Sequence, residues 1–176
     1  MCDNWPWPGY FPESFATVPR LRTTLVRFTL SALVALAGLA WLVPWALYGL
    51  ALHNIEGRPG APTLRQVSRE DEAFLREHLK VQRGFSIVPL TPIRYVLDTG
   101  VSTTKNSAEE AGTYAAWMVA RDYNSSHLDN KKALWWHLSG AALTIWLTRN
   151  WTPDQILSRA AEVTRQRTER SKPQQK

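Results

Sequence analysis

The feature that most constrains this chain is a run of 25 residues, from Phe28 to Leu52, that contains no charged side chain. The hydrocarbon core of a bilayer is about 30 Å thick, and a helix of about 20 residues crosses it. The run is therefore long enough to span a membrane. Trp41, Trp45 and Tyr48 gather toward its C-terminal end, as aromatic side chains do where lipid meets water.

Charges on the two sides of the run predict its orientation. Arg20, Arg22 and Arg27 precede it closely, whereas only Arg58 and Arg65 follow within a comparable distance. Basic residues are retained on the cytoplasmic side, so we expect a single-pass protein of the inner (cytoplasmic) membrane with a cytoplasmic N-terminus and a periplasmic C-terminal domain. The alternative is a cleaved signal peptide, but the apolar region of a signal peptide is shorter than this run.

This topology divides the chain into five segments. Pro and Gly after the span favour a linker, because both residues interrupt regular structure. The predicted segments are a cytoplasmic segment 1–27, a transmembrane helix 28–52, a linker 53–62, an extracytoplasmic helical domain 63–167 and a polar, basic tail 168–176.

A second uncharged stretch, 133–148, leaves a two-span topology as an alternative. It is shorter than the usual 17–25 residues of a membrane helix, it contains His137 and Ser139, and Lys131 and Lys132 precede it. These features favour a buried helix at the centre of a globular core. Its tryptophans then belong to the core, with a groove for an acyl chain or a sugar as the alternative.

The rest of the domain has the sequence pattern of a mainly α fold. Ser68, Ser107 and Thr152 are each followed three residues later by Asp, Glu or Gln, which is the signature of a capped helix N-terminus. Short strands at 85–88 and 95–97 and a loop at 124–130 complete the prediction. The expected helices cover about 69–80, 107–123, 130–149 and 152–167.

Several classes of site are excluded or disfavoured. The chain has one cysteine, Cys2, so it has no internal disulfide, and its four histidines do not have the spacing of metal ligands. We expect neither a metal nor another cofactor. The net charge is +6, but Glu162 and Glu169 interrupt the basic C-terminal region. That region is typical of a solvated helix end, and no nucleic-acid partner is expected.

Glu70 and Asp71, with Phe74 and then His78, are the candidate catalytic group. A glutamate at a helix start can act as a general base where a cleft removes water from it. The alternative is a solvated first-turn carboxylate, which is favourable beside the positive end of the helix dipole.

These residues resemble a motif of the peptidoglycan glycosyltransferases (glycosyltransferase family 51), which reads Glu-Asp-x-x-Phe-x-x-His; His78 lies one residue late. Segment 112–121 is similar to the family's Gly-Ser-Thr-Ile-Thr-Gln-Gln-Leu-Ala-Lys, and 147–157 to its Leu-Glu-Arg-x-x-Ser-Lys-x-x-Ile-Leu. The resemblance implies a lysozyme-like domain behind a membrane anchor. It also implies that Glu70 is the catalytic base and that Asp71 and His78 support it.

The same resemblance implies that Arg121, Lys131 and Lys132 bind the phosphates of a lipid-linked glycan. The helix after Lys131 contains no acidic residue, although the family has a second functional glutamate there. An active transferase and an inactive relative therefore both stay open. The alternative function is non-enzymatic: a single-pass interaction subunit of an envelope or secretion assembly. The expected partners are membrane lipid, lipid-linked glycan and envelope proteins.

Overall fold

The structure is a computed structural model, and it describes residues 18–63, 66–101, 107–129 and 132–171. The described residues form six helices, and the mainly helical fold class is confirmed. Residues 1–17 of the predicted cytoplasmic segment 1–27, with Cys2 among them, lie outside the described part, as do Lys131 and residues 172–176. The helices are α1 (Val18–His53), α2 (Arg69–Leu79), α3 (Pro92–Val101), α4 (Ala108–His127), α5 (Ala133–Asn150) and α6 (Pro153–Ser171).

The chain forms two compact units, which meet within α1 between Ala40 and Trp41. In the first unit, the described side chains from Leu25 onward are mostly exposed and apolar. Among the described residues, one helix is long and apolar enough to cross a membrane, and that segment is Leu25–His53. This agrees with the predicted single span, and Pro44 lies inside the helix.

The second unit begins with the end of α1, and this end is part of its core. Ala51, Leu52 and Ile55 are buried. The Ser139 hydroxyl donates to the backbone oxygen of Ala51 at 3.1 Å, and Ile55 pairs with Leu128 in an isolated antiparallel bridge. The last two residues of the predicted span, and Ile55 of the predicted linker, are thus covered by protein.

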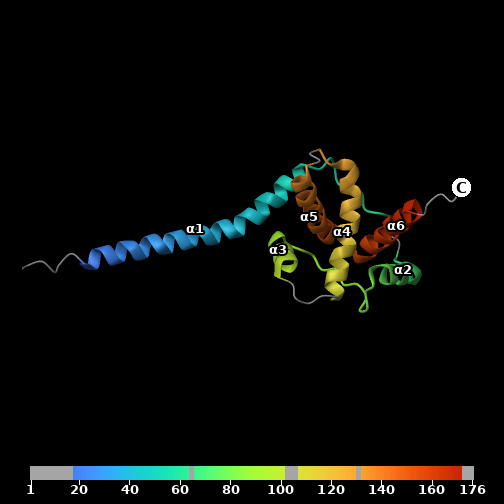
Figure 1. Ribbon diagram of the computed structural model, residues 1–176, viewed down its shortest axis with the longest axis horizontal. Coiled ribbons are helices and arrows are strands. Elements are labelled where there is room, and N and C mark those ends of the chain that lie inside the picture. Colours follow the sequence, from blue (N-terminus) through green and yellow to red (C-terminus); the bar gives the residue numbers. More distant parts are fainter. Residues whose placement is uncertain (1–17, 64–65, 102–106, 130–131, 172–176) are drawn as a thin grey trace, which may run out of the picture. The chain divides into compact units, whose positions relative to one another are not determined.

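Helices α4, α5 and α6 form the centre of this unit, with α2 against α6 and α3 against α5 (Figure 1). Leu143 and Leu147 of α5 are completely buried. Small residues on the same helix, including Gly140 and Ala142, are also buried, and small side chains let helices approach closely. The apolar stretch 133–148 is therefore a core helix in this structure, as its length and flanks predicted.

The three predicted capping motifs are confirmed. The backbone N–H groups of Asp71 and Glu110 donate to the hydroxyls of Ser68 and Ser107 at 3.0 Å each. At Thr152 the motif is reciprocal, because the Gln155 side-chain oxygen also accepts from the Thr152 N–H at 2.8 Å. Each bond satisfies a donor that a helix N-terminus leaves without a partner.

Three local predictions are wrong. Residues 85–88 form no strand, because the Ser86 N–H donates to the Ala108 carbonyl at the start of α4 at 2.8 Å. Residues 95–97 belong to helix α3, which begins with Pro92 and is capped by a bond from the Arg94 N–H to the Thr91 hydroxyl at 3.2 Å. Helix α4 continues to His127 through the predicted loop. It continues because Asn124 is fully buried, and its side-chain amide donates to the Trp136 carbonyl at 2.9 Å.

Candidate functional site

The predicted catalytic residues lie together on α2, but they do not form an enclosed site. Glu70 is exposed in the first turn. The ring of His78 is also exposed and stacks on Phe74, with centroids 5.9 Å apart. Water surrounds an exposed carboxylate, so Glu70 does not lie in a cleft that removes water from it, as a general base would need.

Asp71 is tied to the C-terminal helix. Its carboxylate lies 2.6 Å from the Arg165 guanidinium, which also lies over the Phe74 ring at 4.9 Å. Partial burial raises the pKa of Asp71, but hydrogen bonds from Ser68 and Arg165 and the positive charge of Arg165 outweigh it and leave the pKa lowered. The ion pair joins α2 to α6, so the role of Asp71 in this structure is to hold the two helices together.

The predicted phosphate-binding residues lie elsewhere on the same unit. Arg121 of α4 lies between two indole rings, 5.3 Å from the centroid of Trp117 and 5.3 Å from that of Trp136. Lys132 is exposed at the N-terminus of α5. Arg121 contacts Trp117 and Trp136, whereas Asp71 contacts Ser68 and Arg165. Lys131 lies outside the described part of the chain.

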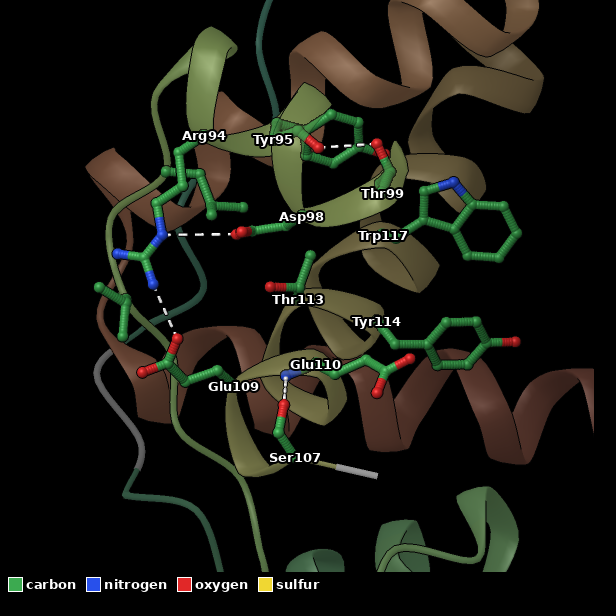
Figure 2. Close-up of a pocket in the computed structure, with 12 residues that line it drawn as sticks. Arg94, Tyr95, Asp98, Thr99, Ser107, Glu109, Glu110, Thr113, Tyr114 and Trp117 are labelled. Atoms are coloured by element: carbon green, nitrogen blue, oxygen red, sulfur yellow. Dashed lines mark hydrogen bonds and ion pairs between the residues drawn. The ribbon is translucent and has the colours of Figure 1, made fainter. Parts of the chain in front are cut away.

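A different site emerges between α3 and the first half of α4 (Figure 2). It is a cleft of about 470 Å³. It contains aromatic, acidic, basic and hydroxyl side chains together. Its lining residues are Val88, Leu90, Arg94, Tyr95, Asp98, Thr99, Ser107, Glu109, Glu110, Thr113, Tyr114 and Trp117.

One wall of this α3/α4 cleft is aromatic. The rings of Tyr114 and Trp117 are stacked, with centroids 5.4 Å apart and planes inclined by 25°. Tyr114 is 46% exposed, so part of its ring faces solvent. Because the Trp117 ring also contacts Arg121, its position is constrained from outside the cleft. This pair offers a flat, pre-formed apolar surface with polar edges.

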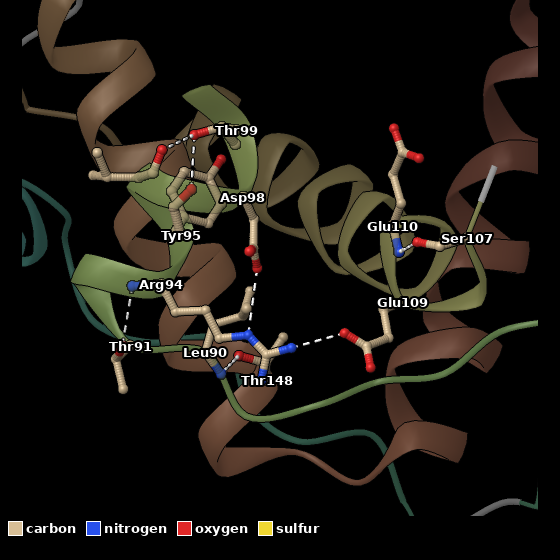
Figure 3. A network of polar contacts seen from close by, with 11 residues as sticks. Leu90, Thr91, Arg94, Tyr95, Asp98, Thr99, Ser107, Glu109, Glu110 and Thr148 are labelled. Atoms are coloured by element: carbon tan, nitrogen blue, oxygen red, sulfur yellow. Dashed lines mark hydrogen bonds and ion pairs between the residues drawn. The ribbon is translucent and has the colours of Figure 1, made fainter. Parts of the chain in front are cut away.

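Another part of the lining is an ionic network centred on Arg94 (Figure 3). Its guanidinium lies 2.7 Å from the Glu109 carboxylate and 3.4 Å from the Asp98 carboxylate. The guanidinium is a planar group with five donors, and two carboxylates hold it in place. Arg94 and Glu109 join α3 to α4 across the cleft.

Tyr95 contributes a phenol from α3. Burial raises its pKa above the ordinary value, so the hydroxyl stays protonated at neutral pH and can donate a hydrogen bond. The hydroxyl of Thr99 donates its hydrogen bond to the backbone oxygen of Tyr95 at 2.7 Å, not to the phenol.

Two close backbone contacts position the walls of the cleft. The Leu90 N–H donates to the buried hydroxyl of Thr148 on α5 at 3.2 Å, which anchors the chain just before α3 (Figure 3). Gly112 of α4 lies against the carbonyl of Ser86, and a Cβ at this position would collide with it. Glycine is thus required here by close backbone approach, a reason unrelated to catalysis.

Sequence reasoning missed the α3/α4 cleft because it assigned α3 in part to a strand. A usable signal was the sequence Thr91-Pro92, a hydroxyl residue followed by proline, which is typical of a helix start. The groups that line the cleft are aromatic ring faces, paired charges and hydroxyls. These groups are suited to binding a ligand. Among the described residues, no group of three or more His, Cys, Asp or Glu side chains could hold a metal ion.

Comparisons of the chain with protein-family models, with curated proteins and with solved structures find no match.

Proposed function

We propose that this chain is a single-pass membrane protein of the cell envelope whose helical domain binds lipid-linked glycan in the α3/α4 cleft and does not transfer it. The observation that carries the proposal is that one cleft is lined both by the stacked Tyr114–Trp117 pair and by the Arg94 ionic network. The resemblance to the peptidoglycan glycosyltransferases supports the choice of glycan.

The chemistry of a sugar matches the two walls. A pyranose ring has apolar C–H faces that pack on aromatic rings, and hydroxyls around its edge that bond to carboxylates and guanidinium groups. The cleft, at about 470 Å³, lies within the range of small-ligand sites, about 300–1,000 Å³. A disaccharide unit is a ligand of suitable size and polarity.

Two observations favour binding without transfer. A glycosyl transfer needs a base held away from water and cations that stabilise the leaving pyrophosphate. Glu70 is exposed, and Asp71 is engaged with Arg165. Arg121, one of the two described cations that the family pattern assigns to phosphate, lies between the rings of Trp117 and Trp136.

The test is a binding titration with the purified full chain in nanodiscs. The probes are a soluble peptidoglycan disaccharide-peptide and a chitin oligosaccharide, measured by isothermal titration calorimetry. We expect Trp117→Ala to weaken binding about 10-fold, equivalent to about 1.4 kcal/mol. The matched control is Trp135→Ala, which removes an indole from α5 that does not line the cleft.

The absence of transfer is tested separately. The chain is incubated with lipid-linked disaccharide substrate, and polymer is followed by gel electrophoresis. We expect no polymer. Polymer that disappears in Glu70→Gln would overturn the binding-only proposal and favour an active transferase, whereas no binding of either probe would overturn the glycan assignment.

The second candidate is the non-enzymatic interaction subunit. The observation in its favour is Leu134, which is 68% exposed at the start of α5, next to Trp135. An exposed large apolar side chain beside an indole is a plausible protein contact. Binding of an envelope protein that Leu134→Asp abolishes and Trp117→Ala preserves would support this candidate over glycan binding.

A further inference from the structure

Few large apolar side chains are exposed on the described surface of the second unit outside α1. Outside α1, the exposed large hydrophobic residues among those described are Val96, Leu97, Tyr114 and Leu134. Tyr114 belongs to the α3/α4 cleft. Val96 and Leu97 are neighbours on α3, and each is 56% exposed. The described part of the unit leaves both of these adjacent, branched apolar side chains more than half exposed.

Helix α3 is held at the C-terminal end of α5. It packs against α5, and the Leu90 N–H just before it bonds to the Thr148 hydroxyl at 3.2 Å. The next residue on α5, Arg149, extends its guanidinium over the Trp45 ring at 5.9 Å. The end of α5 that carries α3 therefore lies beside Trp45 of α1.

Trp45 belongs at the boundary of the bilayer. The segment Leu25–His53 has 29 residues, about 43 Å of helix at 1.5 Å per residue, which exceeds a hydrocarbon core of about 30 Å. Part of its excess lies at the C-terminal end, because Ala51 and Leu52 are covered by the protein core. The lipid-crossing part ends before them, which puts Trp45 at the interface that indole rings prefer.

We propose that the face of α3 formed by Val96 and Leu97 inserts into the boundary between headgroups and acyl chains of the same membrane leaflet. The occupant of this face is lipid, because α3 packs on the end of α5 whose Arg149 contacts Trp45 of the membrane helix. Trp41 and Leu42, one turn earlier on that helix, are also apolar and exposed. An insertion of about 5–10 Å is typical of interfacial helices. Arg149 adds a cation at the level of anionic headgroups.

This inference rests on the membrane helix and does not require that the cleft bind glycan. If the cleft binds glycan and α3 inserts into the membrane, then α3, which lines the cleft, meets a lipid-linked ligand at the membrane surface.

The experiment measures the depth of single fluorescent labels on the full chain. Leu97→Cys and Leu134→Cys are each made in a Cys2→Ser background, labelled with a nitrobenzoxadiazole dye and reconstituted into phosphatidylcholine–phosphatidylglycerol vesicles. Quenching by a lipid with a shallow nitroxide is compared with quenching by aqueous iodide. Leu134 is the matched control, because it is also an exposed leucine but lies at the other end of α5.

We expect the label at position 97 to be quenched several-fold more by the nitroxide lipid than the label at position 134, and several-fold less by iodide. Equal accessibility of both labels to iodide would overturn the proposal. Shielding of position 97 from both quenchers would also overturn it, because protein would then cover the face. Circular dichroism should give the same helix content for both labelled variants and the Cys2→Ser parent.

Discussion

The α2/α6 face and the α3/α4 cleft use the same chemical groups to different effect. Each contains an arginine paired with a carboxylate near a helix start: Arg165 with Asp71 in the first, and Arg94 with Glu109 in the second. On the α2/α6 face the pair bridges two helices that pack directly. In the cleft the pair spans α3 and α4, which leave a cavity between them.

The difference shows that an ion pair between two helices can line a ligand-binding site only where the helices leave a cavity beside it. The motif around Glu70 resembles one of the peptidoglycan glycosyltransferases, but Glu70 itself is exposed in the first turn of α2. The cleft has no recognised motif, yet it combines an aromatic wall, an ionic wall and a volume of about 470 Å³. The following predictions test whether the two regions differ as described.

The largest effect is expected from Gly112→Ala. The added Cβ collides with the Ser86 carbonyl, and the segment that leads to the cleft residues Val88 and Leu90 must move. We expect a loss of about 3 kcal/mol, the upper part of the range for overpacking, measured by thermal unfolding of the full chain in detergent. Gly140→Ala is the control, since its Cβ would lie 3.8 Å from the Asn124 side chain, an ordinary contact. Equal stability of the two variants would contradict the close approach.

A smaller loss is expected from Thr148→Val. The substitution keeps the shape but leaves the N–H of the buried Leu90 without its acceptor, at a cost of about 1–2 kcal/mol. Amide hydrogen exchange at Leu90 should accelerate. The control is Thr144→Val, because the Thr144 hydroxyl donates only to Gly140 of its own helix. If Leu90 exchanges at the same rate in both variants, Thr148 does not anchor the cleft wall.

Asp71→Asn should have a modest and pH-dependent effect. The pKa of Asp71 is lowered in the folded chain, so its ionised form stabilises the fold above the unfolded pKa of about 3.9, and this stabilisation is lost as pH falls through the folded pKa. We expect Asp71→Asn to cost less than about 1 kcal/mol at pH 7, as for a partly exposed pair. The difference from the parent should vanish in acid.

A double-mutant cycle with Arg165→Met separates this ion pair from the capping bond at Ser68. A coupling energy near zero at pH 7 would show that Arg165 does not stabilise Asp71.

The smallest effect is expected from Glu70→Gln. Glu70 is exposed, and a surface substitution changes stability by less than about 0.5 kcal/mol. Glycan binding in the cleft should also stay unchanged. A loss of binding comparable with that of Trp117→Ala would place Glu70 in the binding site and erase the distinction between the two regions.

Much of the architecture is readable from short-range patterns. The capping motifs at Ser68, Ser107 and Thr152 located three helix starts, because a cap depends on residues three positions apart. The apolar stretch 133–148 was identified as a core helix by its length. The C-terminal end of α4 was missed because Asn124 continues the helix through a bond to Trp136, twelve residues away.

The sequence by itself determined the membrane-length helix, the helical class and the helix starts, since these depend on local composition and spacing. Only the tertiary structure decided which residues meet. Thr148 acquires a role because Leu90 reaches it, Gly112 because Ser86 lies against it, and Trp117 because α3 stands opposite. These contacts join residues distant in the chain, and their energies depend on the packing of whole helices, which no local pattern records.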